Sequence, residues 1–205
     1  MELELKKECL DTYELGEPQT LTQEETAETI VPDYCPDIAR IISAEGVVCL
    51  HGGTEQDGVT GTVRVTVLYT PENESGVRAL EFAMPFSAQG EGLAGCAHVV
   101  VETEIELLES RMLNPRKIFT RCKLVTHLAG CRKVCLTISS DAETDPALLV
   151  EKRCCGQTVS LLRQVAEKDL TFSETMSLSL GREGAAELLH CRANGIVTET
   201  KAIGN

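Results

Sequence analysis

Three residues with metal-binding side chains recur at equal intervals late in the chain: His127, Cys131 and Cys135. Imidazole nitrogen and thiolate sulfur are ligands that zinc prefers in proteins. Zinc sites favour tighter pairs such as Cys-x2-Cys, however, and the spacing here straddles a turn expected between two strands. The sequence therefore leaves open a metal site and a purely structural role in core and turn.

The ten cysteines and four histidines also raise the question of cysteine-based catalysis. A catalytic thiol needs surroundings that lower its pKa or a strand-to-helix elbow, and no cysteine has that context. Cys154 and Cys155 are adjacent, so their side chains would point to opposite faces of a strand, which disfavours a redox pair. We expect most cysteines, such as Cys49 and Cys135, to be reduced and buried in apolar strands. A disulfide could still form in oxidising surroundings, and the sequence does not decide the redox state of the cysteines.

Charged side chains give two further candidates. Glu102, Glu104 and Glu106 alternate along a strand and are most simply its solvated face. Arg116 and Lys117 have the chemistry to bind an acidic partner, although a basic pair at the start of a strand is the simpler interpretation. The glycine-rich stretches precede no expected helix, so they form no phosphate cradle. We therefore expect no catalytic residue, no cofactor and no enzymatic activity.

The composition limits the class of protein. The chain has 205 residues and a formal charge of −13, which argues against binding nucleic acid or anionic membranes. Hydrophobic residues make up 42% of it, enough for a real core, although the chain has no tryptophan. The N-terminal residues lack the apolar core of a signal peptide, and no apolar run approaches the ~20 residues of a membrane span. We expect a cytoplasmic protein without membrane insertion.

The element around which these residues must be arranged is a β-hairpin over Gly61–Ser87. Apolar and polar residues alternate with a period of two on both sides of a segment rich in turn-forming residues. The positions expected to be buried are Val63, Val65, Val67, Leu80, Phe82 and Met84. This hairpin is predicted to be the central pair of a sheet.

One short helix is predicted after residue 35. Pro36 suits the first helical position, where the missing N–H costs nothing. Ile38, Ile41 and Ile42 lie at positions i, i+3 and i+4, which would form one apolar face. Gly46 would end this helix.

The later segments alternate again and predict further strands. His98–Leu108 is expected to form one strand, with one face made of Val99, Val101, Thr103, Ile105 and Leu107. Lys117–Leu128 and Lys133–Ser139 are expected to form two strands that meet at a turn over Ala129–Gly130. The predicted fold is mainly β, an antiparallel β-sandwich or twisted sheet with one short helix per repeat.

The last part of the chain looks like a second, incomplete repeat. The interval from Glu25-Thr26 to Gly46 equals the interval from Glu174-Thr175 to Gly195. We predict a β module over residues 1–147 and the start of a second copy over residues 148–205. Because this second copy lacks a hairpin, it would add strands to the first module, pair with another chain or remain poorly ordered. The sequence does not settle whether the chain is a fragment of a longer protein.

Several short blocks occur in an order that resembles one known family. They are Gln19–Leu21, Ile30–Asp33, Pro36–Ile42, Val67–Tyr69, Leu80–Phe82, Pro85–Ser87, Leu113–Asn114 and Arg116–Ile118. In this order they resemble the SPOCS domain, a domain of unknown function found in SipL-type spore-coat morphogenetic proteins of clostridia and their relatives. The resemblance covers about residues 15–140 and extends weakly to 148–205.

The resemblance implies a non-enzymatic structural or interaction role in spore-coat assembly. The chain would act in the cytoplasm of the mother cell, at the forespore surface or the spore coat. Its partners would be other spore-coat morphogenetic proteins or a second copy of itself. Family members often continue into a LysM domain, but none lies within these residues, so partner binding through LysM does not transfer. The alternative from the residues themselves is a small ligand- or metal-binding β-module that uses His127, Cys131 and Cys135.

Overall fold

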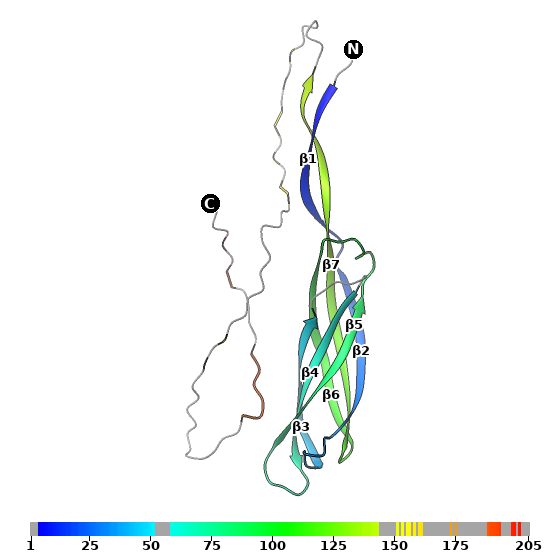
Figure 1. The fold of residues 1–205 in the computed structure, drawn as a ribbon, viewed down its shortest axis with the longest axis vertical. Coiled ribbons are helices and arrows are strands. Elements are labelled where there is room, and N and C mark those ends of the chain that lie inside the picture. Colours follow the sequence, from blue (N-terminus) through cyan, green and yellow to red (C-terminus); the bar gives the residue numbers. More distant parts are fainter. Residues whose placement is uncertain are drawn as a thin grey trace.

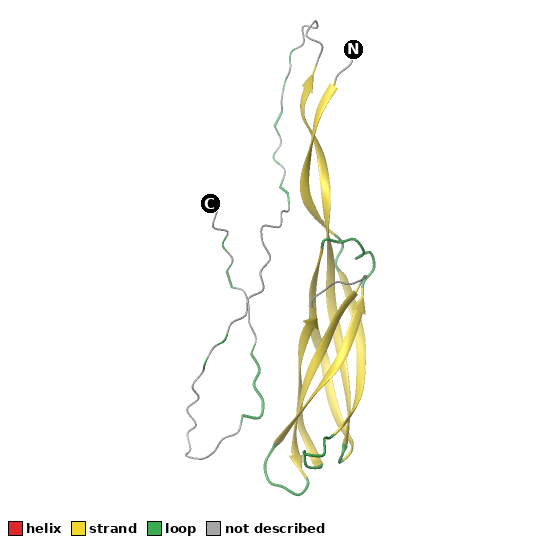
Figure 2. Ribbon diagram, viewed as in Figure 1, coloured by secondary structure: helices red, strands yellow, loops and turns green. Residues whose placement is uncertain are grey.

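The computed structural model is mainly β, and its sheets are antiparallel (Figure 2). The structure describes residues 4–51, 58–143, 151, 153, 155, 156, 158, 160, 161, 173, 175, 188–193, 198, 199 and 201. The strands are β1 (Glu4–Leu15), β2 (Gln19–Ile30), β3 (Ile38–His51), β4 (Gly58–Pro71), β5 (Arg78–Gln89), β6 (His98–Asn114) and β7 (Lys117–Glu143). These described residues contain no helix.

The strands form two sheets. In sheet A, β7 pairs with β1, β2 and β6; in sheet B, the strand order is β3-β4-β5. One apolar core draws side chains from both sheets, because Val65 of β4, Leu80 of β5 and Leu124 of β7 belong to the same buried cluster. The alternation of β2 to β7 therefore directs one face of each of these strands toward this shared core.

The predicted hairpin is confirmed as β4 and β5. Val63, Val65 and Val67 of β4 are at most 1% exposed, and Leu80 and Met84 of β5 are nearly as buried. Gly76 lies in the connection with a φ of 105°, a conformation that favours glycine. The hairpin is not the central pair of its sheet, however, because β4 is central and β5 is an edge strand.

The predicted helix after residue 35 is wrong. Residues from Ile38 onward belong to β3, which pairs with β4. Its register shifts between Ile38 and Arg40 and again between Ile41 and Ser43. Each bulge adds one residue, so the side chains of Ile38, Ile41 and Ala44 all contribute to the core at intervals of three residues. Two bulges thus reproduce the spacing of a helix face. Ile42, placed on that face by the prediction, is 50% exposed.

A bulge also corrects the predicted face of β6. Val99, Val101 and Ile105 pack against the apolar clusters as expected. The register then shifts between Ile105 and Leu107, and Leu108 contacts the core in place of Leu107. The predicted alternation is therefore right for the first half of the strand only.

The two strands predicted on either side of Ala129–Gly130 are one strand, β7. Gly130 pairs with Val99 of β6, and its carbonyl accepts a hydrogen bond from the N–H of Gly16 at 2.7 Å. A Cβ atom at Gly130 would lie 2.6 Å from Cys96 Sγ in the β5–β6 loop. The glycine therefore allows a loop to approach the strand closely, rather than making a turn.

The two ends of β7 lie in different surroundings. β1 and β2 follow one another along β7, since Leu15 pairs with Cys131 and Gln19 with Leu128. We call β1 together with residues 131–143 of β7 the arm, and the rest of the two sheets the body. Figure 1 shows the arm extending from the body as a twisted two-stranded ribbon. At the base of the arm, Cys131 still pairs with His98 of β6; beyond it, none of the described strands pairs with the other edge of either arm strand.

The predicted second repeat over residues 148–205 lies largely outside the described residues. Its expected Glu-Thr pair and the segment around Gly195 both include positions that the structure does not describe. The repeat therefore stays a prediction.

Candidate interaction surfaces

The first candidate surface surrounds Arg116, at the turn between β6 and β7. Its guanidinium donates to the carbonyl oxygens of Val31 and Cys35, each at 2.8 Å. It also donates to the carboxylates of Asp33 at 3.0 Å and Asp37 at 3.1 Å. One cation thus fixes the whole connection between β2 of sheet A and β3 of sheet B, an arrangement that only a branched guanidinium can make.

Backbone hydrogen bonds reinforce this Arg116 cluster. The N–H of Val31 donates to the carbonyl of Arg116, and the N–H of Ile38 donates to that of Pro115, both at 2.9 Å. The hydroxyl of Tyr69 donates to the carbonyl of Pro36 at 3.3 Å. Burial, together with the neighbouring Cys35 thiol, raises the pKa of Tyr69 above its usual value, so the hydroxyl keeps its proton to a higher pH than that of an exposed tyrosine.

The structure gives both predicted interaction residues acidic partners within their own chain. Arg116 binds Asp33 and Asp37, and Lys117 forms an ion pair with Glu28 of β2. Neither pairing was apparent from the sequence, because the acidic partners lie far away along the chain; Arg116 and Asp37, for example, are 79 residues apart. The available signal was that three separate blocks of the family resemblance supply this single cluster: Ile30–Asp33, Pro36–Ile42 and Arg116–Ile118.

The three predicted metal ligands do not come together. His127, Cys131 and Cys135 lie at every fourth position of the extended strand β7, so consecutive members are about 13 Å apart along the backbone. One metal ion cannot bind all three at such a spacing. Within the described part of the chain, no group of three or more His, Cys, Asp or Glu residues is arranged to hold a metal ion.

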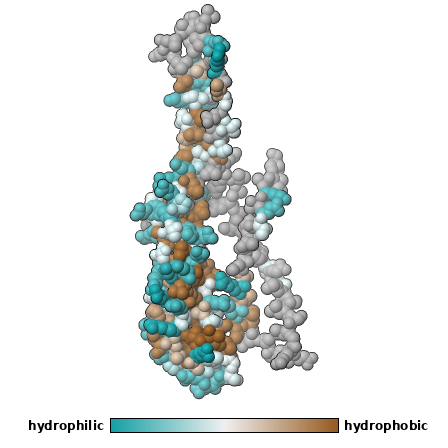
Figure 3. All heavy atoms as spheres, turned by 180° about the vertical axis from the view of Figure 1, so that it is seen from behind, coloured by the Kyte–Doolittle hydropathy of each residue, from teal (hydrophilic) through white to brown (hydrophobic). Residues whose placement is uncertain are grey.

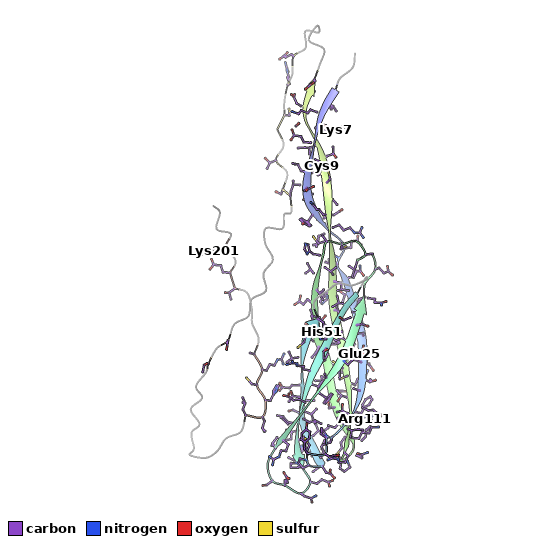
Figure 4. All side chains as sticks on the ribbon, viewed as in Figure 1. Lys7, Cys9, Glu25, His51, Arg111 and Lys201 are labelled. Carbon is purple, nitrogen blue, oxygen red and sulfur yellow. A yellow bond between two sulfur atoms is a disulfide. The ribbon has the colours of Figure 1, made fainter. Side chains whose placement is uncertain are left out.

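Each of the three residues has another environment. His127 Nδ1 lies 3.0 Å from the hydroxyl of Thr20 on β2. Cys131 is a half-buried free thiol next to the junction of arm and body. Cys135 forms a disulfide with Cys9 across the arm, where the two Cα atoms are 5.7 Å apart (Figure 4 labels Cys9). The expectation of reduced cysteines is thus wrong for this pair.

The second candidate surface is one face of the arm. The core-facing side of β7 continues past Gly130 as Val134, Leu136 and Ile138, but no strand of sheet B covers it there. Leu10 of β1 pairs directly with Leu136, and the two side chains are 37% and 38% exposed. Seen from behind, Figure 3 shows hydrophobic residues continuing from the body along the arm.

The outer face of sheet A is a charged, solvated surface, as predicted for its glutamates. Basic residues of the central strand β7 alternate with acidic residues of the flanking strands: Arg121 pairs with Glu24 of β2, and Lys123 pairs with Glu106 of β6 at 2.8 Å. Arg111 lies over the ring of Phe119 at 4.9 Å. All of these groups are accessible to water, so each pair contributes little to stability.

Cys122 has a thiol whose pKa is shifted away from that of a nucleophile. Burial, with a smaller effect of Glu25, raises the pKa of Cys122 to about 11. A thiol that stays protonated is a poor nucleophile, so Cys122 acts as a core residue.

Comparison of the chain with protein-family models, with curated proteins and with solved structures finds no match. Across the described residues, no helix has the length and apolar character needed to cross a membrane. The assignment of a function therefore depends on the residues and on the surfaces that they form.

Proposed function

We propose that this chain is a non-enzymatic structural or interaction module of spore-coat assembly. It acts in the mother cell at the forespore surface, and its partners are other spore-coat morphogenetic proteins or further copies of itself. In this proposal, residues 1–147 form one β-sandwich module and residues 148–205 begin a second copy.

The Arg116 cluster supports a structural use of the family-like residues. The blocks Ile30–Asp33 and Pro36–Ile42 meet the block that contains Arg116 through hydrogen bonds and ion pairs. These contacts join the two sheets and leave the charged groups paired with each other. Residues can recur within a family because they stabilise its fold. Such residues need no reactive chemistry, which agrees with a non-enzymatic role.

The arm is the observation that carries the interaction role. An isolated two-stranded ribbon is at best marginally stable in water, and sheets usually bury one face. Here Leu10 and Leu136 form a cross-strand pair that remains more than one-third exposed beyond the end of sheet B. A strand edge and a partly exposed apolar face on a projecting element favour addition of another protein surface.

The proposed role is tested first by deletion of the gene. We expect expression confined to sporulation and spores with a defective or detached coat. Expression restricted to vegetative growth, or a normal coat in the deletion strain, would contradict the role in coat assembly.

Complementation of that deletion then tests the arm. The variant L10S/L136S removes the exposed leucine pair, and the matched control L5S/L15S removes two exposed leucines from the opposite face of β1. We expect the control to restore the coat and L10S/L136S to fail although it accumulates as folded protein. Full rescue by both variants would exclude this face of the arm as the assembly surface.

A further inference from the structure

The outer face of sheet B holds a short segment from the distant end of the chain. His190, Cys191, Arg192 and Ala193 line a shallow groove across β3, β4 and β5. Thr66 of β4 points to this outer face, yet it is only 8% exposed. A strand position on the solvent side of a sheet is normally open, so its burial marks a covered surface.

Two basic side chains of this segment, His190 and Arg192, lie against the body. His190 Nε2 lies 3.3 Å from Glu45 Oε2 of β3, a separation that makes an ion pair when the imidazole is protonated, and the side chain is 20% exposed. Arg192 also lines a second hollow, between β3 and β6, together with Gly46 and Ile105. The segment therefore reaches from the face of sheet B to the gap between the two sheets.

The charges of the groove and the segment are complementary. Glu45 and Glu81 line the groove, and Glu104 lines the adjoining hollow. The segment places the two basic residues of a His-x-Arg sequence along the same surfaces, and His190 lies directly beside Glu45. Opposite charges that face one another in this way favour the placement of the segment in the groove.

We propose that this groove is a recognition site for the segment Leu188–Ala193, and that the segment of a second copy binds there to link molecules. Identical contacts form within one chain or between two, which is the basis of exchange between protomers. The stretch of chain between Glu143 and Leu188 spans up to roughly 145 Å when extended, far enough to reach a neighbouring molecule. This inference goes beyond the proposed function, because it holds whatever assembly the chain serves.

The test uses full-length chains and a labelled peptide with the sequence of residues 186–194, in which Cys191→Ser prevents disulfide exchange. In the variant H190A/R192A the groove is open, so we expect it to bind the peptide at least about tenfold more tightly than the wild type, whose own segment competes. Fluorescence anisotropy measures this affinity. No binding to H190A/R192A overturns the proposal.

Charge variants establish that the groove is the binding site. Added to H190A/R192A, E45K is expected to abolish peptide binding and the milder E45Q to weaken it. The matched control E102K makes the same charge change on the outer face of sheet A and is expected to leave binding unchanged. Equal losses in E45K and E102K would show a non-specific charge effect and overturn the site, provided that thermal melting shows all variants folded.

Sedimentation velocity tests the contact between copies. The wild type is expected to associate as its concentration rises, and excess peptide or the H190A/R192A change is expected to reverse this. A wild type that stays monomeric at every concentration, while H190A/R192A binds the peptide, overturns the exchange between copies. Neither result depends on a sporulation phenotype, so failure here is distinguishable from failure of the proposed function.

Discussion

The two halves of β7 share an alternating sequence pattern, but sheet B covers only one of them. In the body, Ile118 and Leu124 are fully buried beneath sheet B. In the arm, Leu136 lies on the same face of the same strand and is 38% exposed. Alternation therefore determines which side chains share a face, whereas the presence of a second sheet determines how deeply that face is buried.

This difference makes the body the stable unit and the arm the adaptable one. The body adds a shared core, the Arg116 cluster and close packing at Gly130. The arm has one paired ladder and a cross-strand disulfide. A region with little buried apolar surface opens more readily, and such regions are suited to binding.

The largest difference in stability is expected between two variants that each truncate one leucine of β7, one in the body and one in the arm. Leu124→Ala removes a fully buried side chain in the body, so we expect a loss of about 3 kcal/mol in the free energy of unfolding. Leu136→Ala in the arm should cost less than about 1 kcal/mol, because the side chain is already partly hydrated. Urea unfolding measures both values. Similar losses at the two positions would mean that the arm is as well packed as the body.

Loss of the Arg116 guanidinium should have the next largest effect. Arg116→Ala leaves two carbonyls and two carboxylates without their shared donor, and we expect a loss of about 2 kcal/mol. The control Arg121→Ala removes an exposed ion pair with Glu24 and should cost less than about 1 kcal/mol. Equal midpoints of urea unfolding in the two variants would contradict the role assigned to the cluster.

Adding a methyl group at Gly130, at the junction of body and arm, should lower the free energy of unfolding by a smaller amount. In Gly130→Ala the new Cβ would meet Cys96 Sγ at 2.6 Å and Leu93 at 3.3 Å, so the β5–β6 loop must shift. We expect a loss of about 1 kcal/mol in thermal or urea unfolding. The control Gly156→Ala has nothing within 4 Å and should leave stability unchanged. If Gly156→Ala lost stability and Gly130→Ala did not, the assignment of close packing to Gly130 would be refuted.

A comparison of two thiols tests the burial of the body core directly. Because its folded-state pKa is raised to about 11, the Cys122 thiol stays protonated below that pH, and only about one molecule in a thousand carries the thiolate at pH 8. Cys122 should therefore react slowly with iodoacetamide in the native protein, while the exposed Cys155 reacts freely. Peptide mapping by mass spectrometry measures both rates. Rapid modification of Cys122 would contradict its burial and reopen a cysteine-based activity.

The sequence predicted the hairpin because its alternation is uninterrupted. The prediction from sequence was wrong where the same spacing of residues can arise from two different structures. Three-residue intervals at Ile38, Ile41 and Ala44 arise from two bulges, and they look the same as a helix face. Gly130 allows close packing rather than a turn, a distinction that depends on the approach of Cys96 from a loop much earlier in the chain.

The candidate surfaces were harder to predict for a similar reason. Arg116 was identified as an interaction residue, but its carboxylates lie 79 and 83 residues away, so its true partners depend on the fold. The equal spacing of His127, Cys131 and Cys135 drew attention to a metal, yet equal spacing along a strand keeps ligands apart. The exposure of the arm follows from where sheet B ends, which no pattern within β7 indicates.

The central claim is that β7 leaves the shared core near Gly130 and continues as an exposed arm. Hydrogen exchange resolved along β7 of the full chain in dilute solution tests it most directly. We predict slow exchange for Ile118–Leu128 and exchange at least about a hundredfold faster for Val134–Ala142. Equal protection of the two stretches in the monomer would contradict the account.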